Sequence, residues 1–241
     1  MPRFYCPLPL VTGAIIALPE NIIRHVQVLR LSEGDIVTLF NGEGGEFMAT
    51  LTGVDRKRAN AIIGAHSSRE VELFFPITLA QALPEASKMD WVIEKAVELG
   101  VATIQPLAAQ RSVVKLSAER AEKRQAHWQG IIASASEQCG RNRLAQLEPL
   151  ADFNRWIAQP STQARILFSP RATQSLAGWA KNQTPQAVTL MIGPEGGFTE
   201  QEEQLAVARG AILLSLGERV LRAETAGMFA VAAIQSVWSV H

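Results

Sequence analysis

The chain has 241 residues, 47% of them hydrophobic and 19% charged, a composition that excludes an intrinsically disordered protein and allows one large or two modest domains. Its 23 basic and 23 acidic residues balance, so the overall charge gives no argument for nucleic-acid binding. Two cysteines without paired spacing and four scattered histidines support neither a disulfide framework nor a metal site. No apolar run reaches the roughly 18 residues of a membrane span and the first residues lack a signal-peptide pattern, so we expect a cytoplasmic protein with no membrane segment.

Residues 1–72 are predicted to form a small β-rich domain. Its strands are expected at residues 36–40, 46–51 and 59–63, and the glycine-rich turn 41–45 between the first two is typical of a hairpin. A short helix is expected over residues 22–29, where apolar residues recur at helical spacing, and Asn21 is its expected cap.

Residues 73–241 are predicted to form an α/β domain with a parallel sheet, because strand-like and helix-like segments alternate there. Strands are expected at residues 75–81, 101–105, 164–168, 187–192 and 211–216, with Pro106 ending the second of them. Helices are expected at residues 88–99, in a long basic segment that starts near Ser117, and at residues 224–238, whose wide apolar face fits a core or an interface.

Two of these apolar strands lead directly into glycine-bearing loops. One loop reads Gly193-Pro-Glu-Gly-Gly-Phe198, and the other begins at Gly217. Open α/β sheets bind ligands at the carboxyl ends of their strands, and glycines let backbone amides and carbonyls come close to a flat base. Thr199 and Glu202 match a capping box for the next helix, which Gly210 is expected to end. The alternative is that the first loop is only a tight strand-to-helix turn.

Two common nucleotide-binding motifs do not match the sequence. A P-loop needs Lys-Ser or Lys-Thr after its glycines, and neither follows Gly197. The dinucleotide fingerprint fails at Gly42-Glu-Gly-Gly45, because Phe47 stands where the third glycine belongs.

Residues 192–198 followed by residues 216–226 resemble the signature of the 16S ribosomal RNA uridine-N3 methyltransferases, a family of the SPOUT superfamily. The resemblance extends through residues 24–30, 94–101, 111–113 and 137–141, and it departs from the family pattern at Ala145 and Glu218. It implies a PUA-like RNA-binding β-barrel in the first 72 residues and a SPOUT α/β domain with a deep trefoil knot after them. It also implies S-adenosylmethionine as cofactor, a homodimer, and 16S rRNA or the small ribosomal subunit as partner.

The resemblance further implies roles for individual residues. Cofactor binding is expected of Leu167, Gly193, Pro194, Glu195, Gly196, Gly197, Leu216, Gly217, Arg219, Val220, Leu221 and Arg222, with residues 167–171 lining the cofactor site. RNA binding, through phosphate or base contacts, is expected of Arg3, Arg24, His25, Arg30, Arg111, Arg141 and Arg143.

Catalysis is expected of Arg222 and Glu224. Methylation at uridine N3 requires loss of the N3 proton, so a base or a cation that stabilises the deprotonated ring is needed. Arg222 could stabilise the negative charge, and Glu224 could orient that arginine or take the proton, with Glu195 as a second carboxylate near the loops. The alternative is that Arg219, Arg222 and Glu224 form a structural ion network.

Other readings of the sequence stay open at this point. Cys139 lies beside arginines and could be the nucleophile of a carbon methylation, although methylation at a ring nitrogen needs none and a packing role is favoured. The same fold could methylate another RNA atom, such as a ribose hydroxyl. A non-catalytic RNA-binding assembly factor is the alternative from a different class of protein.

Overall fold

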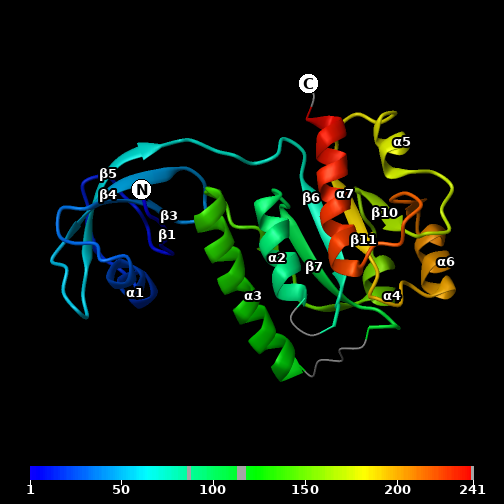
Figure 1. The fold of residues 1–241 in the computed structure, drawn as a ribbon, viewed down its shortest axis with the longest axis horizontal. Coiled ribbons are helices and arrows are strands. Elements are labelled where there is room, and N and C mark those ends of the chain that lie inside the picture. Colours follow the sequence, from blue (N-terminus) through cyan, green and yellow to red (C-terminus); the bar gives the residue numbers. More distant parts are fainter. Residues whose placement is uncertain (86–87, 113–117, 240–241) are drawn as a thin grey trace. The chain divides into compact units, whose positions relative to one another are not determined.

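The computed structural model describes residues 1–85, 88–112 and 118–239 (Figure 1). Residues 113 and 117, which the sequence analysis named, lie outside the described residues. Among the described residues, no helix is long and apolar enough to cross a membrane.

The chain divides into two compact units. The first unit comprises Met1–Glu72 with Ala133–Leu144, and the second unit comprises Leu73–Ile132 with Ala145–His241. The sequence placed residues 133–144 in the second domain, whereas in the structure they join the first unit.

The first unit is a five-stranded sheet with one helix. Its elements are β1 (Arg3–Tyr5), β2 (Ile15–Ala17), α1 (Glu20–Val28), β3 (Ile36–Phe40), β4 (Glu46–Thr52) and β5 (Asn60–Ser67). The strand order is β1-β3-β4-β5-β2, in which β1 runs parallel to β3 and the other neighbours are antiparallel. The three predicted strands and the hairpin between β3 and β4 are confirmed, while β1 and β2, with three residues each, are too short to show a pattern in the sequence.

Helix α1 covers the core of the first unit with one apolar face. Ile22 and Val26, four residues apart, are fully buried in one cluster with Leu39 and Leu51 from the strands. Burial of each such side chain contributes about 2 kcal/mol relative to exposure. The apolar spacing that predicted this helix therefore marks its buried face.

The predicted cap of α1 is wrong. The helix begins at Glu20 and Pro19 takes the N-cap position, so Asn21 lies inside the first turn. The proline ring fixes the backbone φ at the helix entrance, here −59°, and the negative charge of Glu20 suits the positive end of the helix dipole.

The second unit is built on a parallel sheet. Its elements are β6 (Ile77–Ala82), α2 (Lys88–Glu98), β7 (Thr103–Ala108), α3 (Ala118–Cys139, which ends in the first unit), β8 (Gln146–Leu147), β9 (Ala151–Asp152), α4 (Phe153–Ile157), β10 (Ala164–Phe168), α5 (Leu176–Ala180), β11 (Val188–Ile192), α6 (Glu200–Ala208), β12 (Ile212–Leu214) and α7 (Ala223–Trp238). The strand order is β12-β10-β11-β6-β7-β8, with β9 also pairing with β7, and every pairing is parallel. The predicted fold class is confirmed, and the trefoil knot stays a prediction of the resemblance.

Strand β11 forms the centre of this sheet. All five of its residues are buried, and it pairs with β10 on one side and β6 on the other. Helix α7 packs against β11 and β6, and also against α2 and α5 (Figure 1). Beyond the carboxyl end of β11, the predicted capping box of Thr199 and Glu202 at the start of α6 is confirmed. Gly210, with φ of +84°, follows the end of that helix.

Pro106 does not end its strand, contrary to the prediction. Strand β7 runs from Thr103 to Ala108, and Pro106 lies inside it. On the outer side of β7, strand β8 pairs as far as Ile104 and strand β9 pairs from Leu107 onward. Among the described residues, no strand therefore pairs with Pro106 on that side. The missing N–H of proline therefore costs no ladder hydrogen bond there.

Arg30 is the one non-glycine residue with positive φ, 55°, among the described residues. It follows the C-cap Leu29, its amide donates to the Gln27 carbonyl at 3.0 Å, and the Leu31 amide donates to the Val26 carbonyl at 2.9 Å. Glycine is the usual residue at such a helix end, because a Cβ costs about 1–2 kcal/mol in the left-handed conformation. The exposed arginine is therefore retained at a cost in stability.

Replacing this arginine by glycine is expected to stabilise the protein. Arg30→Gly should raise the free energy of unfolding, measured by chemical denaturation, by about 0.5–1 kcal/mol because glycine adopts positive φ without strain. Leu29→Gly is the matched control, since Leu29 is exposed and has a φ of −81°, where glycine should lower the same free energy by about 0.5–1 kcal/mol. Equal losses in both variants would contradict the strain at Arg30.

Candidate functional site

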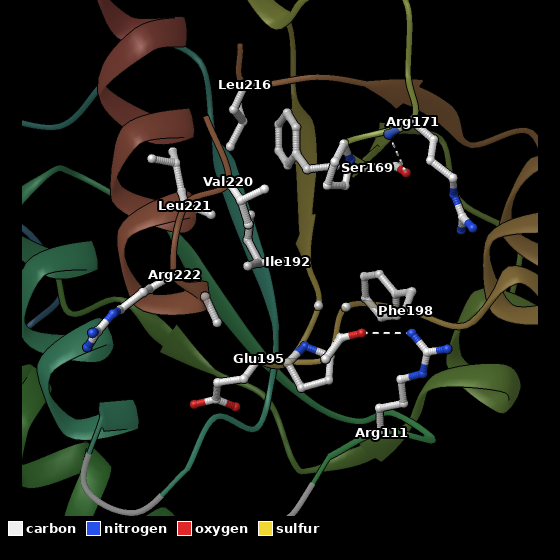
Figure 2. Close-up of a pocket in the computed structure, with 18 of the residues that line it drawn as sticks. Arg111, Ser169, Arg171, Ile192, Glu195, Phe198, Leu216, Val220, Leu221 and Arg222 are labelled. Atoms are coloured by element: carbon white, nitrogen blue, oxygen red, sulfur yellow. Dashed lines mark hydrogen bonds between the residues drawn. The ribbon is translucent and has the colours of Figure 1, made fainter. Parts of the chain in front are cut away.

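Three adjacent parallel strands bring three loops to one edge of the second unit's sheet. Strand β10 pairs with β11 on one side and with β12 on the other, so the carboxyl ends of all three lie together. A cavity of about 550 Å³ lies among the loops that follow them (Figure 2). It is lined by residues 168–171 at the end of β10 and beyond it, 192–198 at the end of β11 and beyond it, and 216–217 and 219–223 between β12 and the first residue of α7, together with Arg111, Glu203 and Ala226.

The cavity brings together all the predicted cofactor-binding residues except Leu167. Leu167 is fully buried in β10 and belongs to the same core cluster as Met191. Because side chains alternate along a strand, the next residue, Phe168, lines the cavity instead. Sequence reasoning also missed Phe198 and Glu203, since neither shows a local signal beyond the loop and the capping box.

The loop after β11 forms a tight turn. The Gly197 amide donates to the Pro194 carbonyl at 2.8 Å, and Gly197 has a φ of +66°. A Cβ on Gly193 would lie 2.9 Å from the Phe198 amide nitrogen, so the chain folds back where only glycine fits. The loop therefore presents a fixed backbone surface to the cavity.

Two arginines are held at the rim of the cavity by other parts of its lining. Nη1 of Arg111 donates to the Gly196 carbonyl at 2.8 Å (Figure 2). Nη2 of Arg171 lies 2.7 Å from Oε2 of Glu203, which is buried. Arg111, predicted to contact RNA, thus braces the glycine loop in the structure.

Glu195 connects the glycine loop to the start of α2. Its Oε1 accepts hydrogen bonds from Lys88 Nζ at 2.9 Å and from the Glu85 amide at 3.0 Å. Burial raises the pKa of Glu195, but these hydrogen bonds outweigh it and hold the pKa below its ordinary value. Lys88 was missed because no local pattern marks the first residue of a helix as the partner of a loop 107 residues later.

The two candidate catalytic residues lie at the N-terminus of α7. Arg222 is the N-cap residue, is exposed and lines the cavity, whereas Glu224 lies in the first turn and outside the lining. Oε2 of Glu224 is buried and has no hydrogen-bond partner among the described residues. Unpaired buried acceptors are uncommon in folded proteins, so this carboxylate oxygen is a candidate for contact with a ligand or with water. Figure 2 shows the side chains of Arg222 and Glu195 pointing out of the cavity on the same side.

The alternative of a structural ion network finds no support. Among the described residues, Arg219, Arg222 and Glu224 form no ion pair with one another or with a third charged residue.

Two of the predicted RNA-binding arginines are structural residues of the first unit. Arg141 is 3% exposed, and its Nε donates to Oε1 of Glu72 at 2.9 Å in a two-point ion pair. Arg3 is paired with Glu46, and its guanidinium lies 5.0 Å from the centre of the Phe40 ring. Both guanidinium groups are engaged within the first unit, and RNA binding by Arg3 and Arg141 stays an untested prediction.

The remaining predicted RNA contacts of the first unit have accessible side chains. Arg24 and His25 are exposed on α1, where Arg24 pairs with Glu20 one turn away and with no other carboxylate among the described residues. Arg143 has a side chain that is 55% exposed and lies 3.4 Å from Glu70. Exposed ion pairs of this kind contribute little to stability, so these cations can exchange their partners for phosphates.

Cys139 ends α3 in the first unit and does not line the cavity of the second. Its predicted alternative role as a nucleophile therefore has no support. Within the described ranges, no group of three or more His, Cys, Asp or Glu is placed to hold a metal ion.

Comparison with known proteins groups the chain with RNA methyltransferases. Residues 71–235 match the model of an RNA methyltransferase domain, and residues 18–64 match that of an RNA methyltransferase PUA domain. The ribosomal RNA small subunit methyltransferase E of Synechocystis is 34% identical over 229 residues, which span 93% of this chain and 74% of the relative. The chain belongs to the ribosomal RNA small subunit methyltransferase E family.

Solved structures of this methyltransferase E family and its relatives share the fold over nearly the full length. The Neisseria gonorrhoeae methyltransferase E, bound to S-adenosylmethionine, is 40% identical, with a TM-score of 0.91 over 99% of this chain and 98% of its own. A Legionella pneumophila methyltransferase in complex with the same cofactor is 35% identical, with a TM-score of 0.93 over 98% of this chain and 97% of its own. The similarity therefore includes both units of the chain.

The close approach at Gly193 predicts a large difference between two glycine substitutions in this methyltransferase loop. Gly193→Ala should lower the free energy of unfolding by about 1–3 kcal/mol, because its Cβ would clash with backbone atoms of Gly197 and Phe198. Gly196→Ala is the control, since its Cβ would meet only the flexible Arg111 side chain, at 3.3 Å, and should change stability by less than about 0.5 kcal/mol. Chemical denaturation of both variants measures the difference, and equal losses would contradict the packing.

Proposed function

We propose that this member of the methyltransferase E family transfers the methyl group of S-adenosylmethionine to the N3 atom of a uridine in 16S rRNA of the small ribosomal subunit. The proposal is supported above all by the three-loop cavity. The chain that forms it is 40% identical, over 99% of its length, to a relative whose structure contains this cofactor. The choice of the N3 atom rests on the resemblance of residues 192–198 and 216–226 to the uridine-N3 methyltransferase signature.

The residues of the cavity fit this cofactor. Its volume of about 550 Å³ is in the range of small-molecule sites. A Cβ on Gly197 or Gly217 would meet nothing within 4 Å, so both glycines offer bare backbone to open space. Backbone amides and carbonyls there suit the edge of a flat base, while Ile192, Leu216 and Leu221 supply apolar contact.

The chain's part in the reaction is to orient the uridine and to remove its N3 proton. When bound, S-adenosylmethionine supplies a methyl group on a positively charged sulfur, which is already a good electrophile. Glu224 is assigned as the proton acceptor, because its buried Oε2 has no donor among the described residues. Arg222 is assigned to the negative charge that develops on the uracil oxygens, because its exposed guanidinium points out of the cavity beside Glu195 (Figure 2) and has no carboxylate partner in the described part of the chain.

Glu195 is assigned to position the loop rather than to accept the proton. Its Oε1 is engaged by Lys88 and the Glu85 amide, and its lowered pKa makes it a weaker base. Glu224 stands outside the cavity lining whereas Arg222 lines it. We therefore infer that the uridine approaches from the α7 side, and that the cofactor fills the cavity.

RNA contacts are assigned to the exposed basic residues of the first unit, Arg24, His25, Arg30 and Arg143. Such residues position RNA by its phosphates. The left-handed conformation of Arg30 supports the assignment, because a strained residue is retained when its side chain serves a function.

Methyl transfer to small ribosomal subunits that lack the modification tests the proposal directly. With S-adenosylmethionine carrying a labelled methyl group, nucleoside mass spectrometry should identify 3-methyluridine as the product. A 2′-O-methylated nucleoside would replace the N3 assignment by the ribose reaction. No transfer, with cofactor and RNA still bound, would replace the enzyme by an assembly factor.

Removing the assigned proton acceptor should slow the reaction and spare cofactor binding. Glu224→Gln is expected to lower kcat by about 10²–10⁴-fold, because the amide cannot accept the N3 proton, while the Kd for S-adenosylmethionine stays within about threefold. Glu218→Gln is the matched control, since Glu218 is an exposed carboxylate in the same loop outside the cavity lining. Equal kcat values for the two variants would remove Glu224 from the mechanism.

We also propose that the chain forms a homodimer through the outer side of α7. Two large apolar side chains are exposed on packed neighbouring helices, Phe229 on α7 at 45% and Trp91 on α2 at 44%. Exposed apolar groups of this size favour an interface over solvent.

A charge on this face should dissociate the dimer. Phe229→Glu is expected to convert the protein to monomer in sedimentation velocity, because an unpaired carboxylate would be buried at the interface. Val207→Glu, at a 50% exposed position on α6, should leave the sedimentation coefficient unchanged. A wild-type monomer, or a Phe229→Glu dimer, would overturn this assignment.

A further inference from the structure

A second cavity lies at the opposite end of β10 from the three loops. Its volume is about 450 Å³, and it is lined by the segment after α4 together with Arg165 and Arg209. Arg165 is the second residue of β10, whereas Phe168 at the other end lines the first cavity. The second cavity has two arginines and no acidic residue in its lining.

Arg165 is buried and held in one orientation. Its side chain is 8% exposed, and Nη1 donates to the carbonyls of Ile157 at 3.0 Å and Gln159 at 2.8 Å. Its guanidinium carbon lies 4.6 Å from the centre of the Trp156 ring. Two carbonyls and an aromatic face thus fix the plane of the guanidinium at the cavity.

The positive charge of Arg165 has no counter-charge in the described part of the protein. No carboxylate lies within ion-pair distance there, and its Nε is buried without a hydrogen-bond acceptor. Burial lowers the pKa of the guanidinium, because desolvation disfavours its charged form. Buried charges in proteins are normally paired, so an unpaired one in a cavity is completed by an anion.

The other side chains of the cavity add donors of the kind that an anion needs. Arg209, the C-cap residue of α6, is exposed and has no ion-pair partner among the described residues. Oε1 of Gln163 accepts hydrogen bonds from the hydroxyls of Thr78 at 3.3 Å and Thr189 at 2.9 Å, which leaves its NH₂ group as a donor. Two guanidinium groups with neutral donors are the recognition set for phosphate oxygens.

We propose that the cavity formed by Arg165 and Arg209 binds a phosphate group. The phosphate belongs either to an RNA backbone or to a small phosphorylated molecule, since the same donors recognise both. The site is separate from the three-loop cavity and does not depend on the methyl-transfer reaction. Arg165 supplies the fixed, buried contact, and Arg209 closes the site from the exposed side.

The first arm of the test measures binding of inorganic phosphate by thermal unfolding at constant ionic strength, with chloride as the reference salt. Phosphate should raise the Tm of the wild type, and Arg209→Gln should weaken its binding roughly tenfold by removing one charged hydrogen-bond donor. Arg155→Gln is the matched control, because Arg155 is an exposed arginine of α4 outside the cavity lining. Phosphate also stabilises folded proteins in general, and this effect should raise the Tm of the wild type and of both variants equally. A difference in Tm between them therefore reports binding at the site.

The second arm distinguishes the two sources of the phosphate. Affinity for a 16S rRNA fragment is measured against salt concentration for the same three proteins. An RNA phosphate at the site predicts that the slope of log affinity against log salt falls by about 1 in Arg209→Gln and is unchanged in Arg155→Gln. Equal slopes, together with phosphate binding that depends on Arg209, assign the site to a small phosphorylated molecule.

Two outcomes overturn the proposal. One is a wild type whose Tm rises no more in phosphate than the Tm of Arg209→Gln. The other is an equal loss in Arg209→Gln and Arg155→Gln in both arms, which would reduce the effect to overall charge. Arg165→Lys, if it folds, gives a further check, because a lysine keeps the charge but loses the guanidinium fork and should weaken phosphate binding.

Discussion

The position of β10 between two parallel neighbours is the constraint on which the main cavity depends. Its register pairs Leu167 with Met191 of β11 and with Leu213 of β12, so the three strands end at nearly the same level. Their loops consequently open on one space. A register slip of one residue would turn Leu167 out of the core and Phe168 out of the cavity, which the complete burial of β11 opposes. The close approach at Gly193 then fixes the central loop.

Four arginines of this chain show two different physical situations. Arg141 and Arg3 in the first unit are held by carboxylates of Glu72 and Glu46, and loss of either partner would leave an uncompensated charge in a largely buried place. At the two cavities of the second unit, Arg222 and Arg165 have no carboxylate partner among the described residues. Arg222 is exposed, so water solvates its charge, whereas Arg165 is buried and its unpaired charge costs stability. The cost at Arg165 favours an anionic ligand in the cavity beside it.

The sequence predicts what is local and misses what depends on distant contacts. The strand at residues 164–168 and the capping box at Thr199 follow from short-range patterns, and both are confirmed. Propensity predicts that Pro106 ends its strand. Strand β7 continues through Pro106 because neither β8 nor β9 pairs with that residue on the outer side. Arg141 is a residue type that often contacts RNA, but in the structure it pairs with Glu72. The sequence does not indicate this pair, because the two residues are 69 positions apart. The glycine loops were predictable because their chemistry lies in consecutive residues, and the second cavity was not because its arginines come from separate elements.

The first unit includes residues from far along the chain, so its boundary cannot be drawn at a single position. Strand β1 has a single neighbour, β3, and the Tyr5 amide donates to the carboxylate of Glu137 at 2.8 Å. Burial raises the pKa of Glu137, and only the Tyr5 hydrogen bond and nearby cations oppose that rise. A chain cut at residue 72 would leave the half-buried Tyr5 amide and Glu72 carboxylate without these partners, at about 1 kcal/mol for each lost hydrogen bond. The two units are therefore linked through α3, whose last residues belong to the first unit.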